Sequence, residues 1–305
     1  MKIIQKLQRE YCAPKAIYIL NNISEVPLYH EDYSVRHPEA SYVVSLRTVF
    51  ERINKVLDGL DELYERPDVN KKKEDEILES TDHMLDALAE HIEDCGGILR
   101  SFYKKSEKKE FKKSLSIFHR NISFYKKHIG TIVNYMKHNQ GVLRFIDFSN
   151  DGGDIFGYYV EGPWDSNSLG PAKEIHGGEN TAFSFNRDIA LHVCSVYYVS
   201  SCLSERLGDM HDELRKPVHS QSQKEKSGDW EKLLDRVGAM NGFMLPDELI
   251  KPKPLVKSAK MFTIDYPSKT KPKALSGIAD VHTSFQGDGV THTFIVPYMN
   301  NAANK

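Results

Sequence analysis

The sequence is poor in cysteine and has no long hydrophobic run. Its four cysteines, Cys12, Cys95, Cys194 and Cys202, form no CxxC pair, so neither a disulfide framework nor a zinc ribbon is indicated. No stretch approaches the roughly 20 apolar residues that a membrane span needs. The first residues alternate charged and apolar groups too closely for a signal peptide. These absences predict a soluble, cytoplasmic protein with no metal site, no other cofactor and no membrane partner.

An excess of charge of either sign is also missing. The chain has 41 lysines and arginines against 43 acidic residues, a formal net charge of -2. No global positive field is therefore available to attract nucleic acid or an anionic membrane, and such a partner would need a local patch. The sequence contains no P-loop, dinucleotide-binding glycine motif or GxSxG elbow, so the nucleotide-binding and hydrolase classes marked by these motifs are not indicated.

What the sequence does contain is a series of long helical patterns. Apolar residues recur at spacings of three and four in four segments, each long enough for a helix that buries one face. The second pattern ends at a Gly96-Gly97 pair, which predicts a stop or a kink. Short links between helices favour antiparallel neighbours, and hence a four-helix bundle. The four segments run from Tyr42 to Tyr64, Leu78 to Cys95, Phe111 to Met136 and Phe183 to Leu207.

Two regions show strand patterns instead. The hydrophobic period changes to two on both sides of a Ser-Asn-Asp-Gly-Gly-Asp turn, which predicts a β-hairpin at about residues 142–160. A glycine- and proline-rich loop from Glu161 to Thr181 follows it. Near the C-terminus, two alternating segments joined by Gln-Gly-Asp-Gly predict a second hairpin.

These patterns together predict an α+β protein that is mainly α: a long-helix four-helix bundle with an inserted β-hairpin and a C-terminal β-hairpin region. We expect residues 1–40 to form a lead-in that packs on the bundle. The bundle with its hairpin insert should span 41–207, followed by a polar linker at 208–228. A C-terminal α/β extension should occupy 229–305.

The fourth helical pattern carries three polar residues in its first turns, Arg187, Asp188 and His192. Cleavage of RNA by its own 2'-hydroxyl needs a group that moves protons near neutral pH and a cation that stabilises the phosphorane. Histidine and arginine suit these two tasks without a metal. The same residues also fit a structural role, in which Arg187 and Asp188 cap the helix start and His192 is a satisfied, semi-buried histidine.

The pattern Arg187-x4-His192, with a polar Asp188 after the arginine and in the last helix of a bundle, resembles the HEPN superfamily over roughly residues 41–207. The resemblance implies a metal-independent endoribonuclease or an RNA-binding effector of a toxin or antiphage defence system, with Arg187, Asp188 and His192 as catalytic residues. It also implies a homodimer, because Arg187 and His192 diverge by about 140° around a straight helix. The motifs of two protomers would then face each other at a seam formed by this helix.

A second group of polar residues lies on the third helical pattern and is the candidate RNA-binding surface. Some of these side chains share a lengthwise stripe that could guide an RNA backbone, although a solvated face with cations at a helix C-terminus accounts for the same pattern. The alternative function is a non-catalytic scaffold or sensor subunit that binds a protein, such as an antitoxin or a complex subunit, through the loop after the hairpin and the C-terminal strands. The candidate RNA-binding residues are Arg120, Lys127, Asn134, Lys137 and His138.

Overall fold

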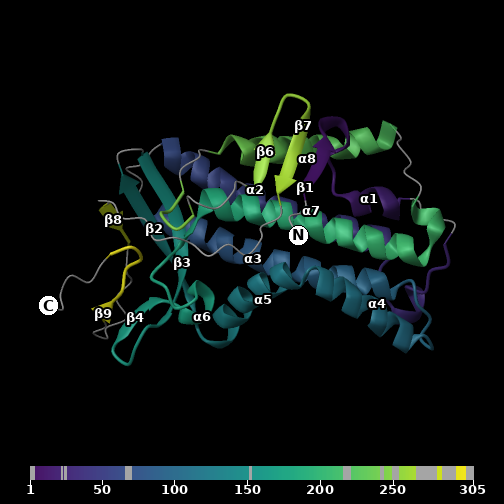
Figure 1. The fold of residues 1–305 in the computed structure, drawn as a ribbon, viewed down its shortest axis with the longest axis horizontal. Helices are drawn as coiled ribbons and strands as arrows, with labels where there is room; N and C mark the ends of the chain where they lie inside the picture. Colours follow the sequence, from purple (N-terminus) through teal and green to yellow (C-terminus); the bar gives the residue numbers. More distant parts are fainter. Residues whose placement is uncertain are drawn as a thin grey trace.

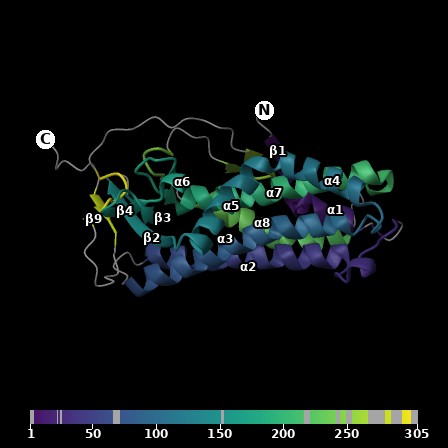
Figure 2. The same ribbon diagram turned by 90° about the horizontal axis from the view of Figure 1, so that it is seen from below.

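The computed structural model describes residues 4–21, 23, 26–65, 71–150, 153–215, 221–240, 244–248, 254–265, 280–283 and 293–299 of the 305-residue chain. Long helices run side by side, and a β-sheet lies at one end of them, on the left in both views (Figures 1 and 2). The protein is therefore mainly α with β elements, which confirms the predicted fold class.

The helical body is built from the four predicted helical segments. Helix α3 lies at its centre and contacts α2, α4, α5 and α7. The two longest helices, α2 and α3, pack closely because Gly59 faces Ile77: a Cβ atom at Gly59 would lie 2.8 Å from Cγ1 of Ile77. The bounds are α2 (Pro38–Glu65), α3 (Lys71–Arg100), α4 (Lys108–Asn121), α5 (Ser123–His138) and α7 (Phe185–Met210).

The predicted stop or kink at Gly96-Gly97 is not where α3 ends. The helix continues through both glycines to Arg100. Gly96 is buried, and a Cβ atom there would lie 3.3 Å from Cδ1 of Leu115 on α4. Gly96 therefore serves close packing between two helices, and its side-chain-free surface outweighs its low helix propensity.

The third predicted helix is in fact two helices that meet at Ile122. Ile122 has φ -94° and ψ 10° and is fully buried, so its side chain stays in the core while the backbone leaves helical geometry. The hydroxyl of Tyr198 on α7 donates to the carbonyl oxygen of Asn121 at 3.0 Å. A side chain that satisfies a carbonyl at the break is a recognised cause of a helix kink.

The predicted hairpin insert is confirmed and forms the middle of a six-stranded sheet. Strands β2 (Val142–Asn150) and β3 (Gly153–Pro163) are antiparallel, with Val142 opposite Glu161. One face of the hairpin packs into the main core, and Leu245 and Tyr298 pack on the other. The remaining strands of this sheet are β4 (Ser168–Pro171), β5 (Phe183–Ser184), β8 (Asp280–His282) and β9 (Thr293–Phe294).

The second predicted hairpin is wrong in its pairing. Strand β8 pairs with β2 and β9 pairs in parallel with β4, so the two strands lie at opposite edges of the sheet. The Gln-Gly-Asp-Gly segment between them is outside the described residues. A C-terminal hairpin does exist one step earlier, where β6 (Leu255–Lys257) and β7 (Met261–Asp265) are antiparallel. Strand β1 (Ile4–Gln8) adds to β7, so strands from the N-terminal and C-terminal regions share a three-stranded sheet.

The predicted polar linker is more helical than its composition suggested. Helix α7 runs to Met210, a 3-10 turn follows at Asp212–Arg215, and α8 (Gln221–Ala239) begins well before Trp230. Glutamine, lysine and glutamate form helices readily, so they extend the helix that Trp230 and Leu233 anchor in the core. The shorter helices are α1 (Lys15–Leu20) and α6 (Lys173–His176), with further 3-10 turns at Arg9–Tyr11 and Glu31–Tyr33. Within the described part of the chain, no helix is both long and apolar enough to cross a bilayer.

Candidate functional site

The start of α7 is fixed by a cap and by a buried carboxylate. Ser184 is the N-cap, as its side-chain oxygen accepts from the backbone N–H of Arg187 at 3.3 Å. Glu248 accepts from the Ser184 hydroxyl at 2.5 Å and from the Ser184 N–H at 3.3 Å. Burial raises the pKa of Glu248 to about 7, although the bonds from Ser184 oppose that shift. The N-cap of α7 is therefore held by Glu248, a residue from the C-terminal part of the chain.

Asp188 and His192 belong to a hydrogen-bonded chain that joins α7 to α5 and β3. Nε2 of His192 lies 3.0 Å from Oδ2 of Asp188, and the same oxygen accepts from the Tyr158 hydroxyl at 2.5 Å. Nδ1 of His192 lies 3.0 Å from the hydroxyl of Tyr125. All contacts are satisfied when Nε2 carries the proton, because His192 then donates to Asp188 and accepts from Tyr125.

The electrostatics of this chain favour a fixed carboxylate. Burial would raise the pKa of Asp188, but His192, His128 and the Tyr158 hydroxyl together lower it below its ordinary value. Burial also raises the pKa values of Tyr125 and Tyr158 well above normal. The chain therefore holds a buried carboxylate that is hydrogen-bonded on both sides, as expected of a structural network in a core.

The burial of the three residues does not suit the predicted catalytic role. His192 is 0% exposed, Asp188 3% and Arg187 9%. Arg187 also points elsewhere: its Nη1 lies 4.0 Å from Sδ of Met244, whereas His192 reaches Tyr125 on α5. In this conformation His192 cannot touch an RNA phosphate, and the motif does not form one open site.

The prediction that α7 forms a dimer seam is also not supported by its packing. Most of its residues are buried within the chain, and it contacts α1, α3, α4, α8 and the sheets. Its exposed residues, Glu205 and Asp209, lie in its last turns, away from Arg187 and His192. The homodimer stays a prediction.

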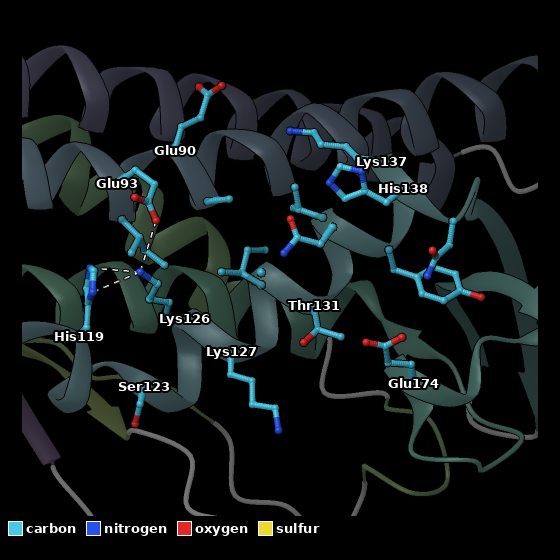
Figure 3. Close-up of a pocket in the computed structure, with 18 of the residues that line it drawn as sticks. Glu90, Glu93, His119, Ser123, Lys126, Lys127, Thr131, Lys137, His138 and Glu174 are labelled. Carbon is cyan, nitrogen blue, oxygen red and sulfur yellow. Dashed lines mark hydrogen bonds and ion pairs between the residues drawn. The ribbon is translucent and has the colours of Figure 1, made fainter. Parts of the chain in front are cut away.

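A groove of about 930 Å³ lies on the other side of α5, between α5 and α3. Figure 3 shows its side chains: Lys126 turns toward Glu93 and His119, whereas Lys127 points away from both. Nζ of Lys126 lies 3.4 Å from Oε1 of Glu93 and 3.1 Å from Nε2 of His119. Positive and negative side chains therefore both lie along the α3 side of the groove. Lys127 carries a positive charge that no acidic side chain among the described residues compensates.

The structure brings four of the five predicted RNA-binding residues together along this groove. Lys127, Asn134, Lys137 and His138 line it and are exposed, while Arg120 lies beyond the break on α4. The predicted single stripe is thus divided at Ile122. Lys137 is engaged as well, because its Nζ lies 2.9 Å from Oδ1 of Asp86 on α3.

Helix α4 carries cations that the predicted site did not include. Lys109, Lys112 and Lys113 are exposed and, with Arg120, fall within about 100° of one another, opposite the buried Phe118. In the described part of the chain none of the four has an ion-pair partner, and neither has Lys127. The sequence KKEFKK at residues 108–113 is basic, but the exposure of its lysines on one outward face becomes clear only from the structure.

Phe124 is the other residue that the sequence reasoning missed. Its side chain is 47% exposed, although it belongs to an apolar residue type. It lies in the first turn of α5, just after the break and between Arg120 and Lys127 along the chain. The signal was present, because Phe124 is off the apolar stripe that includes Ile122 and Tyr125. We call the exposed side chains of Lys109, Lys112, Lys113, Arg120, Phe124 and Lys127 the α4–α5 face.

Comparisons of this chain with protein-family models, with curated proteins and with solved structures each found no match. The described residues hold no group of three or more histidine, cysteine or acidic side chains arranged to bind a metal ion. The α4–α5 face and the buried network are the features of this chain that bear on function.

Proposed function

We propose that the protein binds RNA through the α4–α5 face and that the Arg187-x4-His192 motif is structural. The observation that carries the proposal is the row of unpaired cations on α4 and at the start of α5. Residues 108–138 contain eight lysines and arginines and a single acidic residue, Glu110, in a chain whose net charge is -2. The rest of the chain is therefore negative overall, and this segment is a local positive region to which a polyanion is attracted.

Unpaired surface cations bind a phosphate backbone by releasing its condensed counterions, and a cation already held in an ion pair contributes less. Lys126 and Lys137 are paired with Glu93 and Asp86. The cations of α4 and Lys127 remain available for phosphates. The proposal retains the RNA-binding part of the HEPN-like expectation. A catalytic role for Arg187 and His192 stays a prediction that requires this end of α7 to open.

The test is a binding titration with a labelled single-stranded RNA. The α4 variant replaces four cations with glutamine, and the control variant removes four exposed cations of other elements, so that both lose the same charge. We expect the α4 variant to bind on the order of a hundredfold more weakly, and the control to bind nearly as well as the wild type. Equal weakening of both variants, or no binding by the wild type, would contradict the proposal. The α4 variant carries Lys109→Gln, Lys112→Gln, Lys113→Gln and Arg120→Gln. The control carries Lys6→Gln, Arg47→Gln, Lys55→Gln and Lys260→Gln.

A further inference from the structure

A second depression, of about 440 Å³, lies next to the larger groove, on the α6 side of α5. The two share Ser123, Lys127, Thr131 and Glu174, so they are continuous along α5. Phe124 forms part of the wall of the smaller depression only. The volume of the smaller depression falls within the range of about 300–1,000 Å³ that is typical of sites for small organic groups.

The walls of this depression combine a flat apolar surface with a few polar groups. Phe124 and Ile175 supply apolar surface, and Thr131 supplies a hydroxyl. His128 is also part of the lining, and burial lowers its pKa to about 4, so its ring is neutral at pH 7. Nε2 of His128 is buried and has no hydrogen-bond partner among the described residues. This composition suits a planar, polar aromatic group better than an aliphatic one.

The charges at the rim indicate where a phosphate would lie. Lys127 lines both cavities and has no ion pair in the part of the chain that is described. Glu174 is the only acidic residue in the lining of the smaller depression. A carboxylate there disfavours a phosphate inside but accepts hydrogen bonds from an exocyclic amino group, as carboxylates do with cytosine.

We infer that this depression, which we call the base pocket, binds a single nucleobase that carries an amino group. The base stacks on Phe124, its amino group donates to Glu174, and the adjoining phosphate binds Lys127. The inference rests on the proposed RNA binding and narrows it to single-stranded RNA, since a base in a duplex has no free face for Phe124. Stacking on a base accounts for both the exposure of Phe124 and the unpaired cations on either side of it along the chain.

The experiment measures the affinity of short labelled oligo(A), oligo(C) and oligo(U) RNA for the full chain and its variants. We expect Phe124→Ala to weaken oligo(A) and oligo(C) binding about tenfold, the effect of one lost stack, and Phe124→Trp to retain it. Val142→Ala removes an equally exposed apolar side chain on β2 and should change nothing. Glu174→Gln should reduce the preference for oligo(A) and oligo(C) over oligo(U).

The outcomes separate this inference from the proposed function. If Phe124→Ala binds oligo(A) as tightly as the wild type while the α4 variant is weakened, the base pocket is wrong and the RNA-binding face survives. If no oligonucleotide binds the wild type, both fail. Binding of a double-stranded RNA with equal affinity and equal sensitivity to Phe124→Ala would overturn the pocket. A poly(Glu) peptide that competes as well as oligo(A) would do the same, because it has no base to stack.

Discussion

Oδ2 of Asp188 lies 3.0 Å from Nε2 of His192, one turn along the same helix, and both side chains are buried. Two of the three residues that the sequence suggested as catalytic thus connect α7 to α5 and β3 through Tyr125 and Tyr158. A buried carboxylate that loses one of its donors is left partly uncompensated, and the cost falls on the folded state.

Replacing His192 with alanine should therefore destabilise the protein. We expect the free energy of unfolding to fall by about 3 kcal/mol, because Asp188 loses a donor and Tyr125 loses its acceptor inside the core. Urea unfolding followed by circular dichroism measures the change. Glu205→Ala, an exposed site on the same helix, is the matched control and should stay within about 0.5 kcal/mol of the wild type. A His192 variant as stable as the Glu205 variant would show that the network contributes little.

The buried motif also leads to a prediction about RNA cleavage. Purified wild type and an Arg187→Ala/His192→Ala variant, incubated with total RNA without added metal, should show no cleavage that depends on the two residues. Both proteins should bind RNA alike wherever the variant remains folded, because the α4–α5 face is left intact. Cleavage by the wild type that the variant lacks would restore the catalytic interpretation and imply an opened form of this end of α7.

Glu248 should make stability depend on pH. Its pKa is raised to about 7 in the folded chain, against about 4.3 in an unfolded one. The folded state therefore holds the proton more tightly, and its stability declines as the pH rises from about 4.5 to 7. Glu248→Gln should lack this decline while keeping an acceptor for Ser184 and Leu245. The gap between the two proteins should reach on the order of 3 kcal/mol at pH 7. Parallel pH profiles of unfolding would contradict a neutral buried Glu248.

Two glycines should respond to alanine in opposite directions. A Cβ atom at Gly157 would lie within 2.5 Å of the backbone oxygen of Phe183, so Gly157→Ala must push apart β3 and β5 and should cost about 2 kcal/mol or more. Gly97 is an exposed helical residue with nothing near its Cβ position, and Gly97→Ala should stabilise by about 1 kcal/mol. Thermal unfolding of both variants distinguishes them directly. If Gly97→Ala lost as much stability as Gly157→Ala, the close approach of β5 to Gly157 would not explain the loss at Gly157.

Much of the fold was predictable because long apolar stripes and one hairpin turn are local signals. The helix cap at Ser184 and the register of β2 with β3 follow from residues close in sequence. The continuity of α3 and the break at Ile122 could not be predicted in this way. Gly96 packs against Leu115 of α4, and the carbonyl at the break is bonded by Tyr198 of α7, so both features depend on residues distant in sequence. The pairing of β8 and β9 with different edges is likewise a long-range choice that no turn motif reveals.

The candidate site was predictable in composition but not in exposure. Helical spacing showed that Arg187 and His192 diverge, and they do point to different neighbours. Helical spacing could not show that Tyr125 bonds His192 and that Tyr158 bonds Asp188, since the two tyrosines come from other elements. Phe124 was passed over because an aromatic residue beside an apolar stripe is usually assigned to the core. Its place off the stripe that includes Ile122 and Tyr125 agrees with its exposure in the structure.

The salt dependence of RNA binding tests the central claim most directly. For single strands, the logarithm of the binding constant falls with the logarithm of salt concentration by about 0.7 for each phosphate contact. Removing Lys109, Lys112, Lys113 and Arg120 together should therefore reduce the slope by about 3. The charge-matched control variant should keep the slope of the wild type. Identical slopes for the wild type and the α4 variant would contradict RNA binding by the α4–α5 face.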